Sequence, residues 1–165
     1  MDAQERTALI NLYEQGPAAV LVALEGITPE ELDAREAPGE WSVREIIHHL
    51  GDSEMTSAIR IRLLVVEDNP VIQGYDQEAF ARKLRYDLPI QPPLDAFAAA
   101  RAVTVPLLRS LSDADWRRTG THTEAGHYTA EAWLAIYGVH AHEHAEQITR
   151  ARAAAAASSA QSMIR

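Results

Sequence analysis

Two histidines four residues apart, His140 and His144, are the side chains of this sequence best placed to do chemistry. They lie in an alanine-rich stretch that predicts a helix, and a helix brings residues four apart to one face, one turn from each other. Each neutral imidazole offers a nitrogen lone pair, so two such rings can bind one metal ion. His142 lies between them in sequence but points to nearly the opposite side, and we expect it to stay out of the site.

A second histidine pair, His48 and His49, lies in another predicted helix. Adjacent helical residues differ in direction by about 100°, so only one of the two can face a shared point. His49 lies on the same side as the polar residues Glu45, Ser53 and Thr56 and is the better ligand candidate, whereas we expect His48 at the surface or the rim. Three neutral imidazoles with an open coordination position would form a metal site that can take up water or substrate.

The residues around His140 and His144 favour a buried site over the two alternatives for such a pair, a solvated face or a hydrogen-bonded core pair. Burying imidazoles in an apolar stripe costs free energy unless something ligates or hydrogen-bonds them. Glu143 and Gln147 are placed for contacts to the ligands or for proton transfer. The apolar residues that flank the pair are Trp133, Ile136, Tyr137 and Ile148.

The histidine pattern also has a rival interpretation. Residues 140–144 fit the pattern H-x-x-E-H of one class of zinc proteases. Those enzymes need a further acidic ligand downstream, and no Asp or Glu follows Glu146, so the sequence does not favour a protease. The remaining histidines, His122 and His127, lie in a predicted loop, where we expect both to be solvated.

Composition narrows the classes of protein to which the chain can belong. With 165 residues, 47% of them hydrophobic and 24% charged, it has the profile of one globular domain with a single core. It contains no cysteine, which excludes disulfides, thiolate ligands and a cysteine nucleophile. A formal charge of −9 without a basic run argues against nucleic-acid binding. The N-terminus lacks a basic lead-in and no apolar run reaches roughly 20 residues, so we expect a cytoplasmic protein that does not enter a membrane.

Apolar periodicity predicts an all-α protein without strands, an up-and-down four-helix bundle with short helical insertions. Ser42 with Glu45 matches the capping box that opens a helix, and Thr129 is suited to cap the last one. Gly16–Pro17 should kink the first helix, and residues 119–126 should form a partly extended loop. Long helices are predicted over residues 4–24, 42–66, 94–111 and 129–152, with shorter ones starting at Thr28, Asp76 and Ser112. We expect one domain over residues 1–152 and a fraying Ala/Ser-rich tail over 153–165.

Several spaced motifs between Glu30 and Thr149 resemble the DinB/YfiT-like family of metalloenzymes. They are residues 38–54 (PGEWSVREIIHHLGDSE), 59–63 with 67–70 and 74–76, 126–129, and 137–148. The resemblance implies a four-helix bundle that holds a divalent metal ion, nickel or zinc, through three histidines. The matching positions are His49, His140 and His144. The resemblance also implies a homodimer.

The activity implied by the resemblance remains open between two classes of enzyme. One is a metal-dependent hydrolase; the other is an S-transferase in which the metal activates a low-molecular-weight thiol, which must come from outside because the chain has no cysteine. A non-catalytic metal-binding or stress-associated bundle is the third possibility. The family places a small-molecule pocket above the metal. We expect Arg60, Tyr75 and the loop around Glu124 to border it, with Gln147, or less favourably Glu143, near the metal.

Overall fold

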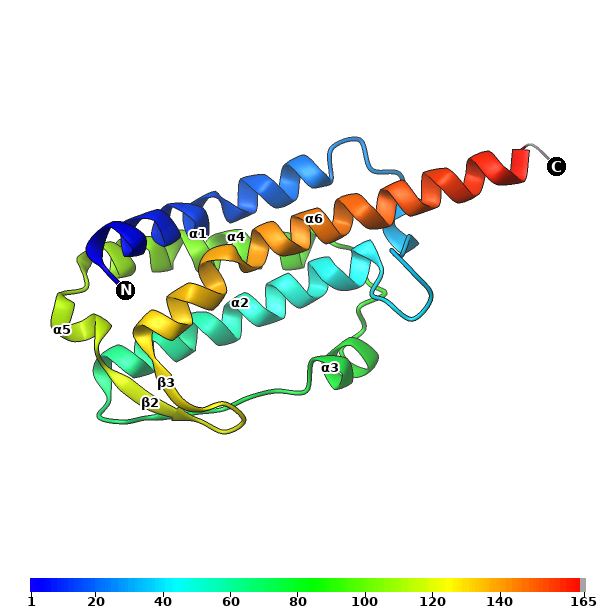
Figure 1. Ribbon diagram of the computed structural model, residues 1–165. Coiled ribbons are helices and arrows are strands. Elements are labelled where there is room, and N and C mark those ends of the chain that lie inside the picture. Colours follow the sequence, from blue (N-terminus) through cyan, green and yellow to red (C-terminus); the bar gives the residue numbers. More distant parts are fainter. Residues whose placement is uncertain (164–165) are drawn as a thin grey trace.

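The computed structural model describes residues 1–163 and is built mainly of helices (Figure 1). This confirms the expected all-α four-helix bundle, in which helices pack on helices around one core. The long helices are α1 (Ala3–Ala23), α2 (Val43–Val66), α4 (Gln91–Ser110) and α6 (Ala130–Met163). The short ones are the 3₁₀ helix η1 (Glu31–Asp33), α3 (Gln77–Lys83) and α5 (Asp113–Trp116).

The capping residues expected from the sequence hold the starts of the two helices that carry the histidines. In α2 the Ser42 hydroxyl accepts from the backbone N–H of Glu45, and the Glu45 carboxylate accepts from the N–H of Ser42. In α6 the Thr129 hydroxyl accepts from the N–H of Ala132. These bonds satisfy backbone donors that the first turn of a helix leaves free, so both starting points are determined locally.

The helix directions differ from the strict alternation of an up-and-down bundle. Helix α1 runs parallel to α6, with Leu9 packed on Gly138 and Arg152 bonded to the carbonyl of Ala23. Helices α2 and α4 are also parallel neighbours, while α2 and α6 are antiparallel. The order is therefore up, down, down, up. Figure 1 shows the reason: the chain leaves the end of α2 and returns along the whole bundle, past α3, before α4 begins.

The expectation that the chain has no strands is wrong. Three short strands, β1 (Val71–Ile72), β2 (Thr119–His122) and β3 (Gly126–Thr129), form a sheet in that order. Strand β1 pairs in parallel with β2, and β2 pairs antiparallel with β3, so that Thr121 lies opposite both Val71 and His127. Strands of two to four residues are too short for a pattern of alternation to stand out in the sequence. The sheet thus attaches the long crossover between α2 and α4 (residues 67–90) to the hairpin of β2 and β3, which precedes α6.

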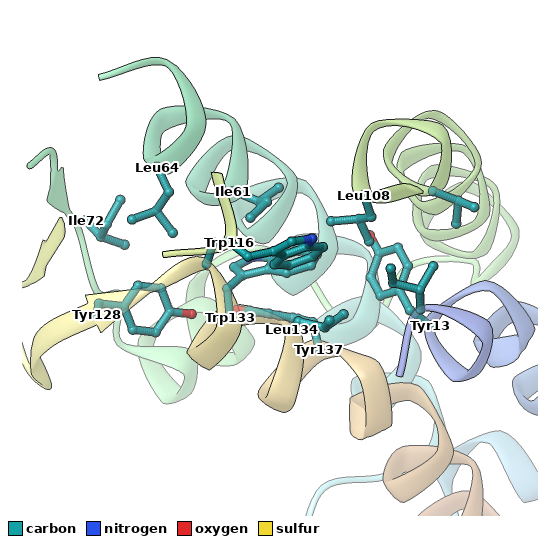
Figure 2. Close-up of a cluster of buried hydrophobic side chains, with 13 residues drawn as sticks. Tyr13, Ile61, Leu64, Ile72, Leu108, Trp116, Tyr128, Trp133, Leu134 and Tyr137 are labelled. Atoms are coloured by element: carbon teal, nitrogen blue, oxygen red, sulfur yellow. The ribbon is translucent and has the colours of Figure 1, made fainter. Parts of the chain in front are cut away.

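The core lies along the bundle axis in two clusters of buried apolar side chains. One is centred on Trp133, whose indole N–H donates to the carbonyl of Ser57 in α2. Figure 2 shows that this cluster draws side chains from α1, α2, α4, α6 and the sheet, so it joins the hairpin to the bundle. The second cluster surrounds Leu50 and Ile148, near the other end of the same helices. His49 and His144 lie among residues of this second cluster, and His140 lies where the two clusters meet along α6.

Gly16 and Pro17 do not end α1, which continues through both residues. Because proline has no N–H, the carbonyl of Tyr13, four residues earlier, has no helical partner. The guanidinium of Arg101 in α4 supplies one, with Nη1 donating to that carbonyl at 2.7 Å. A Cβ atom at Gly16 would overlap with the same Nη1 atom, so only glycine leaves space for it. The sequence signal for a kink thus marks the place where Arg101 docks.

Arg101 contacts all three of the other long helices. It donates to the Glu54 carboxylate in α2 at 2.7 Å and to the Tyr137 carbonyl in α6 at 3.1 Å, besides its bond to α1. Glu54 also accepts from the hydroxyls of Tyr13 and Ser57. The side chains of Arg101 and Glu54 are each 1% exposed, so this is a buried ion pair whose polar atoms are satisfied by hydrogen bonds.

The last helix is longer than expected. The sequence predicts an end near Arg152 and a fraying tail over residues 153–165, but α6 continues to Met163. Alanine has the highest helix propensity, and a run of five alanines follows Arg152, so the segment stays helical as it extends beyond the bundle (Figure 1). Residues 164 and 165 of the predicted tail lie outside the described residues. Among the described helices we find none long and apolar enough to cross a membrane.

Candidate metal centre

Three histidines from two helices meet at one point inside the bundle. The Nε2 atom of His140 lies 3.3 Å from Nε2 of His49 and 3.2 Å from Nε2 of His144. One ligand nitrogen from each of the three lies within 4.8 Å of the others. His49 comes from α2 and the other two from successive turns of α6, so the antiparallel packing of these helices assembles the cluster from positions 91 residues apart.

The spacing of these nitrogens fits a small divalent ion. Zinc binds histidine nitrogens at about 2.0–2.1 Å, and two ligands at a tetrahedral angle are then about 3.3 Å apart. The two Nε2 separations given above match that value. With only imidazole donors and no thiolate in the chain, the set suits zinc, nickel and similar borderline metals. The cluster could therefore hold a divalent metal ion.

Burial keeps all three imidazoles in the neutral form that can bind a metal. Removal from water lowers the pKa of His49 to about 3 and that of His140 to about 2, and each ring's positive form is further disfavoured by its neighbours. The pKa of His144 is lowered for the same first reason, although the Gln147 side chain and the charge of Glu143 act in the opposite direction. At neutral pH the nitrogens that face one another thus carry lone pairs available to a cation.

The ring nitrogen that faces away from the cluster, Nδ1, is hydrogen-bonded in His144 but not in His49. The Nδ1–H of His144 donates to the side-chain oxygen of Gln147 at 2.8 Å, which leaves the lone pair on Nε2. This is the supporting position expected for Gln147. The ring of His49 packs against Trp41, with centroids 4.7 Å apart, and its Nδ1 atom is buried without a hydrogen-bond partner among residues 1–163.

The other histidines have separate partners. His48 stacks on Tyr86 and bonds through Nε2 to the carbonyl of Leu88, at the rim as expected. His142 bonds to the carbonyl of Leu12 in α1, on the far side of α6 from the cluster.

The prediction that His122 is solvated is wrong, while His127 is exposed as expected. His122 is only 9% exposed, because it points inward from β2, packs on Tyr128, and accepts the N–H groups of Glu124 and Ala125 at Nδ1. The sequence interpretation missed it because the strand was not recognised.

A cavity of about 270 Å³ opens beside the histidine cluster. His140 forms part of its wall, together with other residues of α2 and α6, the long crossover and the hairpin. Arg60, Tyr75 and Glu124, the residues expected to border a pocket, all line it. Further lining residues, which the sequence interpretation did not assign to the pocket, are Ser53, His122, Tyr128, Ile136 and Tyr137.

Glu143 is placed differently from the other predicted site residues. Its side chain is exposed on α6 and does not line the cavity. It acts on the cluster through space, since its negative charge raises the pKa of His144. Of the two residues expected near the metal, Gln147 therefore contacts a histidine of the cluster and Glu143 does not.

Comparison with known proteins agrees with this arrangement. A family model for the DinB superfamily matches residues 12–148, which contain α2 and α4, parts of α1 and α6, and the three histidines of the cluster. The chain belongs to the DinB superfamily. The resemblance of the histidine motifs to this family is thereby confirmed.

DinB relatives with similar sequences carry provisional functional names. A protein of Oceanobacillus iheyensis, provisionally named a metal-dependent hydrolase, is 37% identical over 140 residues, which are 85% of this chain and 81% of the relative. YfiT of Bacillus subtilis, named in the same provisional way, is 33% identical over 150 residues, covering 88% and 83%. The solved structure of YfiT, described as having an unusual four-helix bundle topology, superposes with a TM-score of 0.85 at 30% identity over 90% of this chain and 86% of that one.

Proposed function

We propose that His49, His140 and His144 together hold one divalent metal ion, zinc or nickel, and that the protein uses it to transform a small molecule bound in the adjacent cavity. The observation that carries the proposal is the convergence of three neutral, buried or partly buried imidazoles beside a cavity whose wall includes His140. Three protein ligands leave a coordination position open, as in catalytic rather than structural zinc sites. The provisional names of the relatives support the same class of chemistry.

A divalent ion in such a site lowers the pKa of a bound water or thiol and polarises a carbonyl group. The chain's own residues orient the ligands and connect them to the cavity. Gln147 fixes the ring of His144 through Nδ1, and His140 presents the cluster to the cavity. Hydrolysis and thiol-dependent S-transfer both fit this arrangement, and the second needs a thiol from outside because the chain has no cysteine. We place both within the proposal, with a non-catalytic metal-binding bundle as the alternative.

The proposal predicts that metal content depends on the three cluster histidines and on no other. His144→Ala should lose most of the bound metal, whereas His142→Ala, two positions away on the same helix, should retain it. Metal analysis of the purified proteins measures this. Metal at 100 times its dissociation constant should stabilise the wild-type fold by ~2.7 kcal/mol, so chelation should lower its melting temperature and leave that of His144→Ala unchanged. Full metal retention in His144→Ala would refute the site.

A substrate screen of the metal-loaded protein separates the activities. Turnover of activated esters without added thiol supports a hydrolase, and consumption of an electrophile only with an added small thiol supports an S-transferase. Either activity should disappear in His144→Ala and persist in His142→Ala. Metal binding without turnover in both screens would favour the non-catalytic bundle.

We also propose that two chains associate, as the family resemblance implies. An apolar groove of about 1060 Å³ runs between α1 and the middle of α6, lined in part by Ala18, Val22 and Ala145. Val22 is 70% exposed and the adjacent Leu21 59% exposed, so both apolar side chains are accessible to a partner at this groove. A helix pair from a second chain packed on this groove would bury these residues.

Sedimentation at micromolar concentration should therefore give about twice the 18.2 kDa mass of the chain. Val22→Glu should shift the protein toward the monomer, because a carboxylate placed in an apolar interface loses its hydration. Val66→Glu, at an equally exposed valine outside this groove, is the matched control and should remain dimeric. A metal-loaded wild-type protein that sediments as a monomer would contradict the association.

A further inference from the structure

The cavity beside the histidine cluster contains a positive charge without a counter-ion. Arg60 of α2 donates through Nη1 to the hydroxyl of Tyr137 at 3.2 Å and through Nη2 to the carbonyl of Gln73 at 2.7 Å. In the part of the chain that the structure describes it forms no ion pair, although most other arginines do. A guanidinium has five N–H donors, so about three remain for a ligand.

A second unused donor lies in the same cavity. The hydroxyl oxygen of Tyr75 is buried and has no hydrogen-bond partner among the described residues. Its ring lies beside Arg60, with the guanidinium carbon 5.7 Å from the ring centroid. Burial raises the pKa of Tyr75 to about 12, so the hydroxyl keeps its proton and can donate. A buried donor without an acceptor costs free energy, which a bound acceptor would recover.

We propose that this cavity binds a small molecule through a carboxylate group, which accepts hydrogen bonds from Arg60 and Tyr75 while the reactive end of the molecule points to the histidine cluster. This deepens the proposed function and rests on it for the placement of the reactive end. The planar fork of arginine matches a carboxylate. Tyr137 links the two ends of the cavity, since it accepts from Arg60 and its ring lies 5.6 Å from that of His140.

The size and the charge of the cavity limit the ligand further. About 270 Å³ is slightly below the roughly 300–1,000 Å³ of small-molecule pockets, so the ligand is compact. Glu124 also lines the cavity and its negative charge opposes an anion. Its side chain is exposed, so water screens that charge, whereas Arg60 is half-buried and held by two hydrogen bonds. The balance favours a single negative charge on the ligand.

A matched pair of thiols tests the proposal on cobalt-loaded protein. The probes are 3-mercaptopropionate and 3-mercaptopropan-1-ol, which have the same chain length and differ in the carboxylate. Binding of the sulfur is followed by the thiolate-to-cobalt charge-transfer absorption. The acid should bind at least about tenfold more tightly than the alcohol, which corresponds to one charge-assisted hydrogen-bonded contact. Equal affinities in the wild-type protein would overturn the proposal without any variant.

Variants identify the residue that is responsible for the preference for the acid over the alcohol. Arg60→Met should reduce it to within about twofold, while Arg117→Met, which removes an exposed arginine outside the cavity, should leave it unchanged. Glu124→Gln should increase it, because a like charge is removed. Circular dichroism establishes that each variant is folded, and Arg60→Lys, which keeps the charge, replaces Arg60→Met if the latter does not fold. A preference that persists in folded Arg60→Met would mean that the carboxylate contacts the metal instead, and would overturn the assignment to Arg60.

A metal-free measurement keeps this inference separable from the proposed function. Ligand-observed NMR on protein treated with a chelator should show binding of benzoate but not of benzamide, and Arg60→Met should abolish the benzoate signal. If the protein takes up no cobalt, the metal site fails and this measurement alone decides the carboxylate site. If cobalt binds and neither acid is preferred, the metal site stands and the carboxylate site is refuted.

Discussion

Replacing Arg101 by methionine should lower the free energy of unfolding by about 3–5 kcal/mol, the usual cost of removing one partner of a buried ion pair. The substitution leaves the Glu54 carboxylate buried with only two hydroxyl donors. It also removes the donors to the carbonyls of Tyr13 and Tyr137. Methionine fills much of the same volume, so the loss is mainly electrostatic rather than a cavity. Chemical denaturation at pH 7 measures it.

Arg109→Met is the matched control. Arg109 lies two turns further along α4 and pairs with Glu14 of α1, a helix that Arg101 also contacts. Both side chains of this second pair are about half exposed. Exposed pairs contribute only about 0–1 kcal/mol, so its replacement should have little effect. The double variant Arg101→Met, Glu54→Leu should recover part of the loss, because it no longer leaves a buried charge unpaired. Equal destabilisation by the two arginine substitutions would contradict this account.

The metal-free protein should lose stability steeply as the pH falls below about 6.5. The histidines of the cluster have lowered pKa values in the folded state but ordinary values near 6.5 in the unfolded chain. Between those values the unfolded state binds more protons, so acid favours unfolding. His49 and His140 together should lower the free energy of unfolding by about 2.7 kcal/mol per pH unit down to their folded pKa values, and His144 adds in the same direction.

The loss of stability just below pH 6.5 is due to the histidines and not to carboxylates. Carboxylates with lowered pKa values, such as Glu45 and Asp87, have ordinary values of 4.5 and 3.8, so their contribution is lost only at lower pH. Denaturation series at pH 7, 6 and 5.5 in a chelating buffer measure the slope. His140→Gln should reduce it, by an amount that rises toward about 1.4 kcal/mol per pH unit at the acid end of the series, and His127→Gln, at the exposed hairpin, should not. A slope that is the same in wild type and His140→Gln would show that His140 is not held neutral by burial.

The candidate site could be predicted where its signals are local. Helical spacing places His140 and His144 on one face, and the capping residues Ser42 and Thr129 define the helices that carry the ligands. Hydrogen bonding by Gln147 follows from the same spacing of three residues. The choice of His49 over His48 came from polar neighbours and the family resemblance, and the structure brings His49 to the other two.

Features that depend on distant contacts could not be predicted from local patterns. The parallel pairing of α2 with α4 follows from a crossover of more than twenty residues, which leaves no trace in the periodicity of either helix. Strand β2 pairs with a two-residue strand about fifty positions away, and without that pairing the inward direction of His122 is not evident. The partnership of Glu54 with Arg101 is likewise a property of the assembled bundle.

The docking of Arg101 at Gly16 and Pro17 also determines the register of the helices. Two apolar helix faces can slide past each other by one turn, about 5.4 Å, with little change in contact area. In α1, however, the carbonyl of Tyr13 lacks its helical partner because Pro17 follows it, and Gly16 leaves the space beside it. After a slip, the guanidinium would be buried against carbonyls that already have partners. The absence of an N–H at Pro17 thus selects one register of the helices along the bundle axis. The same register determines where along α2 and α6 His49 meets His140 and His144.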